Sequence, residues 1–556
     1  MTTATHSPGD VALAPHTMPE AVATRFRLPH VETSRFIAFW LGLPMRTGAE
    51  DSSAAVAAAL ADVDDVADRG IADLDGMFVL LVYDKRGKTW SVYGDSNGIL
   101  PLYYDDIGCS TSILGMLSDR TYTIDDLDRR AVVDFYLHGV VLSRRTLLRS
   151  VHRLPRRTVL VLRREGGAAV RPLQDVARAA EDSETCVERY FADHARLLGQ
   201  RRVTVLLTGG SDSRWLFCLA RHHLARFRTV IAGEPHSAEV AVAEKVAATA
   251  EVSLDVVPET VANIDEDLET MFLDGDGVVN LVQHHRTWQM ACHESALGQD
   301  VLIHGGGGEF FRDTFSYQDI PIYVGKPNIE KFYRLRLSLS SAVPPFTEPV
   351  YVREIRREVL DRMHGIASAD KHRTYNEIYL IMKAPWIFGG VYAMYRRRGL
   401  HVFAPFLDGR NVAVALARPI AQKMLHRWHR RVVSRRCPQL ARIPMTTGMT
   451  LSDAPLDMLV DAAAYMRDVS LRVVNKLARR WWGRSPFAMG ASAVGRHPDL
   501  AEAVRGARVT ERALGALAAA GILHRDQARE RALAVEELGR LVTVGLLVER
   551  LTVGTP

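Results

Sequence analysis

Residues 203–214 read VTVLLTGGSDSR, and this stretch decides the fold. A short apolar strand runs into a pair of glycines, and a helical pattern follows them. The glycines let the backbone turn tightly, so that several N–H groups and the positive end of the helix dipole face one point. The stretch therefore predicts a phosphate-binding loop. It is neither a Walker loop, which needs Gly-Lys-Ser/Thr, nor a G-x-G-x-x-G dinucleotide loop.

The polar side chains of this loop suit a triphosphate that carries a metal ion. Thr208, Ser211 and Ser213 add hydroxyl donors. Asp212 would repel a phosphate but suits a magnesium ion bound to one. A bare Gly-Gly pair after a strand has about even odds of being only a tight turn with a serine N-cap. The complete string is more specific than that pair.

The flanking sequence predicts an α/β protein. Further short apolar stretches after the loop alternate with helical patterns, which is typical of a parallel sheet covered by helices. These stretches are residues 229–232, 253–257 and 301–304, with an Ala-rich helix over 238–250. Before the loop, the strand patterns at 76–83 and 89–93 predict an antiparallel hairpin, and 158–162 predicts another strand.

These patterns divide the 556-residue chain into four segments. We expect a disordered lead-in (1–25), a strand-rich domain (26–175), a domain built on the parallel sheet (176–450) and a helical C-terminal extension (451–556). The role of the extension stays open between plain core and a docking element for a partner.

The composition excludes several classes of protein. It is 47% hydrophobic and 24% charged, as in ordinary globular chains. The net charge of +5 arises from 70 basic and 65 acidic residues that are interspersed, which argues against a nucleic-acid partner. No apolar run reaches the roughly 18–20 residues of a membrane helix, and the N-terminus lacks a secretory pattern. Five scattered cysteines without C-x-x-C predict a reducing, cytoplasmic location.

The string TGGSDS at 208–213 resembles the S-G-G-x-D-S pyrophosphate loop of the asparagine-synthetase-like ATP pyrophosphatases, with Thr208 in place of the first serine. Other segments resemble this family in the correct order. Residues 76–84 with 94–104 are similar to its glutaminase domain, 304–309 (HGGGGE) to its S-G-E-G-x-D loop, and 405–408 (PFLD) to a helical motif. The resemblance covers about 70–450.

The resemblance implies an Ntn-hydrolase-like αββα sandwich, followed by an adenine-nucleotide α-hydrolase-like synthetase domain with a parallel sheet and a helical C-terminal part. It also implies ATP and Mg²⁺ as cofactors. The nucleotide-binding residues would be Leu207, Thr208, Gly209, Gly210, Ser211, Asp212, Ser213, Gly305, Gly306 and Gly307. The metal ligands would be Asp212 and Glu309, where Glu309 replaces the family's aspartate.

Three positions depart from the family. The chain begins Met1-Thr2-Thr3, without the cysteine that serves the glutaminase as nucleophile, so we expect a degenerate glutaminase-like shell; a Thr2 nucleophile is the less favoured alternative. β-Lactam synthetases and lasso-peptide cyclases share this loss. The family's base aligns with Gly306, which leaves His304 as the nearest candidate base or as a buried structural histidine.

The third departure is a missing lysine that would stabilise charge on the adenylate. Arg442, the arginine run 396–398 or Arg214 could replace it, since guanidinium groups bind phosphates well. Solvent-facing arginines are the alternative at each position.

We therefore expect an ATP-dependent ligase that adenylates a small-molecule or peptide carboxylate and joins it to an amine, in lactam, macrolactam or amide formation of specialised metabolism. One alternative is an asparagine-synthetase-type amidotransferase that takes ammonia from solution or from a glutaminase partner. The other is an inactive scaffold. A precursor peptide is the partner expected of a cyclase, and neither nucleic acid nor a membrane is expected.

Overall fold

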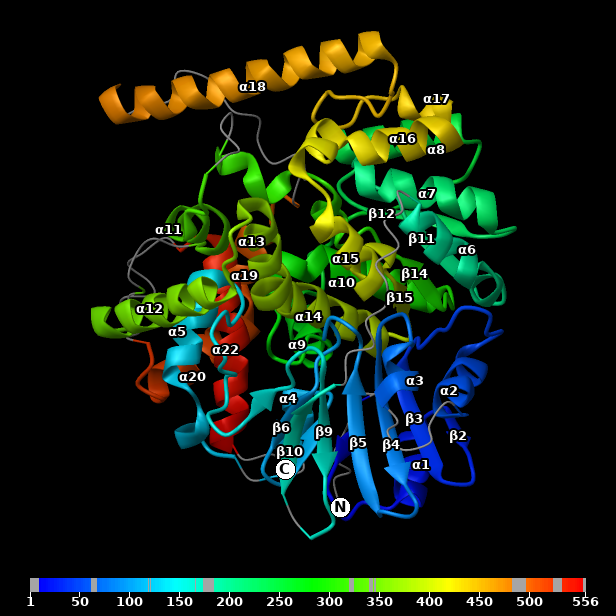
Figure 1. The fold of residues 1–556 in the computed structure, drawn as a ribbon. Coiled ribbons are helices and arrows are strands. Elements are labelled where there is room, and N and C mark those ends of the chain that lie inside the picture. Colours follow the sequence, from blue (N-terminus) through cyan, green and yellow to red (C-terminus); the bar gives the residue numbers. More distant parts are fainter. Residues whose placement is uncertain are drawn as a thin grey trace.

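The first part of the molecule contains two antiparallel sheets (Figure 1). The computed structural model describes residues 10–61, 68–118, 120, 122–165, 167–173, 185–319, 325–339, 344, 347–482, 497–523 and 533–553. The six-stranded sheet has the order β10-β9-β5-β4-β3-β2, with β2 His30–Glu32, β3 Phe36–Gly42, β4 Phe78–Asp84, β5 Thr89–Gly94, β9 Thr158–Leu162 and β10 Ala168–Pro172. The predicted hairpin is β4–β5, paired antiparallel from Asp84↔Thr89 to Val79↔Gly94.

The second sheet has the order β1-β7-β6-β8, with β1 Ala12–Leu13, β6 Tyr103–Asp105, β7 Gly108–Ser110 and β8 His152–Arg153. Helices α2 (Ser52–Ala61) and α3 (Asp68–Ala72) lie beside the six-stranded sheet, and α4 (Ile113–Ser118) and α5 (Arg129–His138) belong to the same part of the chain. Trp40, Val56 and Leu80 belong to a small core between α2 and the six-stranded sheet. The other face of this sheet, with Phe39 and Leu81, joins the main core.

The prediction of a disordered lead-in over 1–25 is wrong for residues 10–25; residues 1–9 lie outside the described part. Strand β1 pairs with β7, and helix α1 (Pro19–Phe26) follows it. Val11 and Leu13 are buried, and the Trp90 indole N–H donates to the Thr17 carbonyl oxygen at 2.9 Å. Several apolar side chains of this segment thus pack into the sandwich, whereas Met18 is exposed.

The second part is built on a five-stranded parallel sheet of order β13-β12-β11-β14-β15. Its strands are β11 Val203–Leu206, β12 Arg228–Ala232, β13 Asp255–Val257, β14 Val301–Ile303 and β15 His401–Phe403. The α/β class and its parallel sheet are confirmed. The prediction that residues 301–304 form the last strand of this sheet is wrong, because β15 adds an edge strand that pairs with β14.

Helices cover both faces of this sheet. Helix α7 (Ser211–His223) packs on β11 and contacts α6 (Cys186–Gly199), whereas α10 (Leu281–Ala296) packs on β12 and β13. The remaining helices of this part are α8 Ala238–Thr249, α9 Ile264–Asp274, α11 Ile329–Phe332, α12 Pro349–Ile366, α13 Lys371–Ile378, α14 Ala384–Arg397, α15 Gly409–Ala417, α16 Arg427–Arg436 and α17 Pro438–Ala441.

The C-terminal extension is helical, as expected, and divides into two kinds of helix. Helices α19 (Leu500–Gly506), α20 (Arg508–Ala519) and α22 (Val535–Val553) belong to the core, and α22 packs on α10 and α20. Helix α18 (Pro455–Trp482) instead runs along the edge of the molecule, at the top of Figure 1. Its Leu456, Leu459 and Val460 are exposed.

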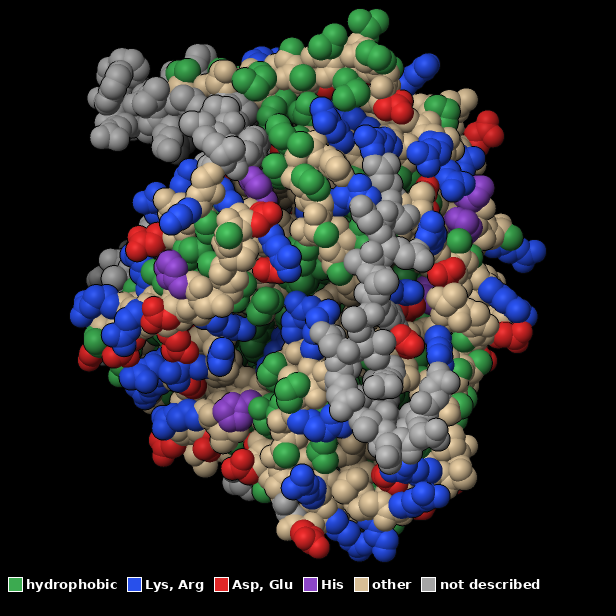
Figure 2. All heavy atoms as spheres, viewed as in Figure 1, with side chains coloured by type: hydrophobic (Ala, Val, Ile, Leu, Met, Phe, Trp, Pro, Cys, Tyr) green, Lys and Arg blue, Asp and Glu red, His purple; other side chains and the backbone are tan. Residues whose placement is uncertain are grey.

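The surface carries both signs of charge. Basic and acidic side chains are interspersed over the face in Figure 2, and hydrophobic side chains gather along α18 at its top. None of the helices among the described residues combines the length and the apolar character that a membrane crossing requires.

Candidate nucleotide site

The predicted loop joins β11 to α7 at the carboxyl end of the parallel sheet. Helix α7 begins at Ser211, with Gly210 as its N-cap. The Thr208 and Ser213 hydroxyl oxygens lie 2.9 Å apart, and the Thr208 N–H donates to the Ser213 hydroxyl at 3.1 Å. The loop is therefore closed by its own hydroxyl groups, and the first turn of α7 presents its N–H groups there, as anion-binding helix ends do.

The glycine-rich stretch after β14 meets this loop. A Cβ on Gly308 would lie 2.2 Å from Cγ of Asp212, and one on Gly305 would lie 3.3 Å from Cβ of the same residue. Gly306 faces Tyr392 and Phe388, and Gly307, at φ 90°, faces Leu407. The predicted glycines thus come together with Asp212, and at 308 glycine is needed because the backbone lies against a carboxylate.

Asp212 has one guanidinium and one imidazole as hydrogen-bonding neighbours. The Arg312 guanidinium donates to its Oδ2 at 2.7 Å, and Nε2 of His429 lies 2.7 Å from its Oδ1. Burial favours a higher pKa for this carboxyl group, but Arg312 and His429 outweigh burial and hold the pKa at about 2. Asp212 is therefore ionised at neutral pH.

Glu309 is placed beside Asp212 but has a different electrostatic character. Its Oε2 accepts the N–H of Gly307 at 3.1 Å. Burial, together with the negative charge of Asp212, raises its pKa to about 7. Tyr379 lies on its other side, and burial and Glu309 raise the pKa of that phenol well above its usual range. The predicted pair of carboxylates is thus adjacent, from loops about a hundred residues apart in sequence.

The donor set at this pair fits a divalent cation. Two neighbouring carboxylates are ligands that Mg²⁺ prefers, and a cation would favour the ionised form of Glu309, which burial and the negative charge of Asp212 disfavour. Arg312 and His429 each take one lone pair of Asp212, and a carboxylate offers about four. A magnesium ion would therefore share Asp212 with these side chains and would bind Glu309 in its ionised form.

His304 is a structural neighbour of the site. Its Nδ1 accepts the N–H of Gly306 at 2.9 Å, and the Tyr392 hydroxyl oxygen lies 2.9 Å from the same nitrogen. Burial lowers its pKa to about 4. These contacts and the burial support the buried structural histidine named as the alternative, because a group this weakly basic with its lone pair occupied is a poor general base.

Neither Arg214 nor the arginine run reaches the loop as a phosphate ligand. Arg214 is fully buried, and its Nη1 donates to the carbonyl oxygens of Leu440 and Ile443 at 3.1 and 2.5 Å, which secures the turn after α17. In the run, Arg396 and Arg397 pair with Asp10, and Arg398 pairs with Asp274. Both alternatives considered for the run, phosphate binding and a solvated face, are wrong, because it holds buried carboxylates.

Arg442 is exposed, in a turn that approaches the nucleotide loop. A Cβ on Gly209 would lie 2.9 Å from Cγ2 of Thr446 in this turn. Of the predicted cations, Arg442 is therefore the one whose segment borders the loop.

Three residues of the site escaped the sequence analysis: Arg312, His426 and His429. Nδ1 of His426 lies 3.1 Å from the Ser211 hydroxyl oxygen, one residue before Asp212. The signal in the sequence was slight. Arg312 follows Glu309 by three residues, and the two histidines have the i, i+3 spacing of one helix face at the start of α16.

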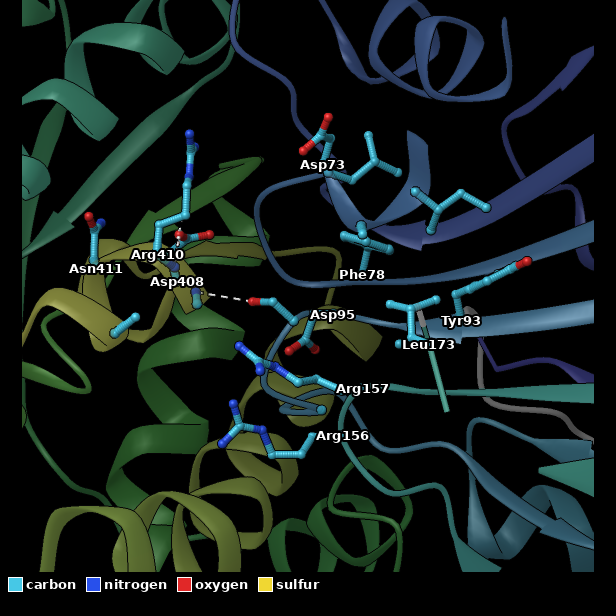
Figure 3. A pocket seen from close by; sticks show the side chains of 18 of the residues that line it. Asp73, Phe78, Tyr93, Asp95, Arg156, Arg157, Leu173, Asp408, Arg410 and Asn411 are labelled. Carbon is cyan, nitrogen blue, oxygen red and sulfur yellow. Dashed lines mark hydrogen bonds and ion pairs between the residues drawn. The ribbon is translucent and has the colours of Figure 1, made fainter. Parts of the chain in front are cut away.

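A cavity of about 920 Å³ lies beside the nucleotide site, between the six-stranded sheet and helices α6 and α15 (Figure 3). Phe78, Tyr93 and Leu173 lie at one end, and Arg156 and Arg157 extend into it from the segment after Leu154. Asp408 and Arg410 line the opposite end. Leu407, which faces Gly307 of the glycine-rich stretch, directly precedes Asp408 of the cavity lining, so one short segment contacts both.

Comparisons with known families agree with this division of the chain. A family described as glutamine amidotransferase domain matches residues 52–172, and the asparagine synthase family matches residues 192–440. No curated protein matches the chain. The second match covers the nucleotide loop, the glycine-rich stretch, Arg312 and His429, and supports ATP-dependent formation of amide bonds in general. The chain thus belongs to the asparagine-synthetase-like family, with a glutamine-amidotransferase-type domain ahead of its asparagine-synthase domain.

Proposed function

We propose that this protein is an ATP- and Mg²⁺-dependent ligase that adenylates a carboxylate substrate, releases pyrophosphate and transfers the acyl group to an amine. The observation that carries the proposal is the meeting of Asp212 and Glu309 at the positive end of α7. Two acidic side chains at a helix N-terminus with glycine-rich backbone on both sides are suited to a metal-bound triphosphate.

The protein would act mainly by positioning and by neutralising charge. The N–H groups of residues 209–212 would hold phosphate oxygens, and Arg312 would offset the negative charge that builds up beside Asp212. His426 fixes the Ser211 hydroxyl, and His429 fixes the Asp212 carboxylate. A bound magnesium ion, held by Asp212 and Glu309, would neutralise the triphosphate.

The adenylation step needs no reagent other than ATP and the substrate carboxylate. An oxygen of the substrate carboxylate attacks the α-phosphorus of ATP, the bond between that phosphorus and the bridging oxygen breaks, and pyrophosphate leaves. The amine then attacks the acyl carbon and expels AMP. His304 receives no role as base, because its pKa is about 4.

We assign the body of the acid substrate to the cavity of about 920 Å³, because Leu407 faces the glycine-rich stretch and the next residue, Asp408, lines the cavity. Its apolar end would take a hydrocarbon or aromatic portion, and Arg156 and Arg157 would attract negative charge. This fits a specialised acid or a peptide better than free aspartate, whose side chain has little to place at the apolar end.

The amine would come from the same substrate, as in lactam or macrolactam formation, or from a second molecule. Cys109, the first cysteine of the chain, is no substitute glutaminase nucleophile, because burial in β7 raises its pKa to about 12. Ammonia from solution or from a partner glutaminase is the second candidate source. The experiment below separates these cases.

The test is carboxylate-dependent ATP–pyrophosphate exchange with a panel of amino acids, dicarboxylic acids and short peptides. We expect exchange with at least one acid, and a loss of about 10²-fold or more in Asp212→Asn. Asp453→Asn, an exposed aspartate between the nucleotide site and α18, is the matched control and should exchange normally. Amide formation that requires added ammonium would favour the amidotransferase.

Two outcomes would count against the proposal. Equal exchange by the wild type and Asp212→Asn would place the chemistry elsewhere. The absence of exchange with every acid, together with no binding of Mg–ATP, would favour the inactive scaffold.

A further inference from the structure

A second group of metal-ligating side chains lies at the opposite end of the parallel sheet. Asp255 begins β13, and His293 and Glu294 lie in the last turn of α10. One ligand atom from each of the three lies within 4.8 Å of the others. Strands β11 and β13 carry the nucleotide loop and its neighbours at their carboxyl ends, so this cluster, at their amino ends, is separate from the proposed active site.

Glu294 has the environment of a metal ligand. Its side chain is fully buried, and the Thr204 hydroxyl on β11 donates to its Oε2 at 2.6 Å. Its Oε1 points toward His293, 4.0 Å from Nε2, and finds no hydrogen-bond donor among the described residues. A buried carboxylate oxygen without a partner is unfavourable, so an ordered cation there would remove a penalty.

Thr204 and Arg228 hydrogen-bond to the two carboxylates of this cluster. Thr204 orients one oxygen of Glu294 and leaves the other for the cluster, in the way that hydrogen bonds commonly hold metal-bound carboxylates. The Arg228 guanidinium donates to Oδ2 of Asp255, so a metal would share this carboxylate with an arginine. The side chain of His293 is 42% exposed.

We propose that Asp255, His293 and Glu294 bind one Zn²⁺ ion, with water as the fourth ligand. A histidine nitrogen with two carboxylates suits zinc better than magnesium or calcium, which prefer oxygen alone. Ligands about 2.1 Å from a tetrahedral zinc lie roughly 3.4 Å apart, so the cluster closes by about 1 Å on binding. The ion would tie the end of α10 to the edge of the sheet and stabilise the fold.

The test is calorimetric titration of the chelator-treated full chain with ZnCl₂, with Co²⁺ absorption as a second signal. We expect His293→Ala and Glu294→Gln each to remove one zinc equivalent or to weaken it by at least tenfold. His364→Ala, an exposed histidine on α12, is the matched control and should bind like the wild type. Zinc should also raise the melting temperature of the wild type and not that of His293→Ala.

The exposed position of His293 keeps the test decisive, because its replacement leaves the fold intact even where Glu294→Gln does not. Zinc held at Asp212 and Glu309 would survive in His293→Ala, so the stoichiometry separates the two sites. The proposal fails if the wild type and His293→Ala bind the same number of zinc ions. It also fails if all four proteins show the same zinc affinity and the same melting temperature.

Discussion

At the residue scale, the side chains that surround Asp212 explain how a buried carboxylate stays charged. Arg312 and His429 donate to its two oxygens, and Gly308 lets a second loop lie directly against it. Glu309, with fewer donors, has a pKa of about 7. The two acids therefore differ in charge because of their neighbours and not because of their type.

The low pKa of His304 gives a prediction on stability. The folded protein holds this histidine with a pKa of about 4, whereas an unfolded chain has about 6.5, so the unfolded state binds more protons between these values. His304 therefore does not lower the free energy of unfolding above pH 6.5. As the pH drops toward 4, it lowers this free energy by at most about 1.4 kcal/mol per pH unit.

The measurement is urea unfolding at pH 7 and pH 5 for the wild type and His304→Gln. We expect the wild type to lose more stability than the variant over this interval. The comparison of the two proteins removes the contribution of other titrating groups to the pH dependence. One of these is His401, because burial also lowers its pKa to about 4. An identical pH dependence in both would show that His304 titrates normally.

The sequence predicted part of this site and missed another part for a physical reason. Thr208–Ser213 and Glu309 follow strands directly, so their local strings fix their positions. Arg312, His426 and His429 meet Asp212 only through tertiary contacts, and neither periodicity nor spacing reports such contacts. The pKa of His304 likewise depends on burial, which its local string left open between a base and a structural histidine.

At the scale of elements, the apolar runs located four of the five parallel strands to within two residues. Strand β15 escaped because three residues, His401–Phe403, lie inside a long helical stretch and become a strand only by pairing with β14. The helix predicted at 238–250 is α8, whose first turn Ser237 caps by accepting the N–H of Val240. Elements with a strong local signal were thus predictable, and an edge strand was not.

The contact between α20 and α22 gives a prediction at this scale. A Cβ on Gly545 would lie 2.4 Å from the Ala513 carbonyl oxygen, so the two helices approach at a glycine. Gly545→Val must force them apart, and we expect a loss of roughly 1–3 kcal/mol in the free energy of unfolding. Urea unfolding measures this loss.

The control is Gly506→Val, at the end of α19, where an added Cβ meets nothing within 4 Å. Its effect should be limited to the small difference in helix propensity between the two residues, which favours valine. Equal losses in both variants would mean that α22 does not pack closely on α20.

At the scale of the whole molecule, the first described residue ties the N-terminal sandwich to the synthetase domain. Asp10 accepts hydrogen bonds from Arg396 at 2.8 Å and from Arg397 at 2.9 Å, and all three residues are buried or nearly so. The domain division predicted from the sequence treated this segment as disordered, because composition says nothing of a single buried ion pair 386 residues away.

Asp10→Ala should therefore destabilise the protein strongly. It leaves two buried guanidinium groups without their main partner, which costs roughly 3–5 kcal/mol. Thermal unfolding should show a large fall in melting temperature. Glu32→Ala, which removes an exposed pair with Lys85, should lower the melting temperature far less. A small effect of Asp10→Ala would mean that the segment before α1 adds little to the fold.

The account as a whole depends on where a nucleotide binds, and one structure decides this most directly. Crystals of the full chain grown with Mg²⁺ and α,β-methylene-ATP should place phosphate oxygens about 3 Å from the backbone nitrogens of residues 209–212, with the metal between Asp212 and Glu309. A nucleotide found in the cavity between α6 and α15, or phosphates away from the end of α7, would contradict it.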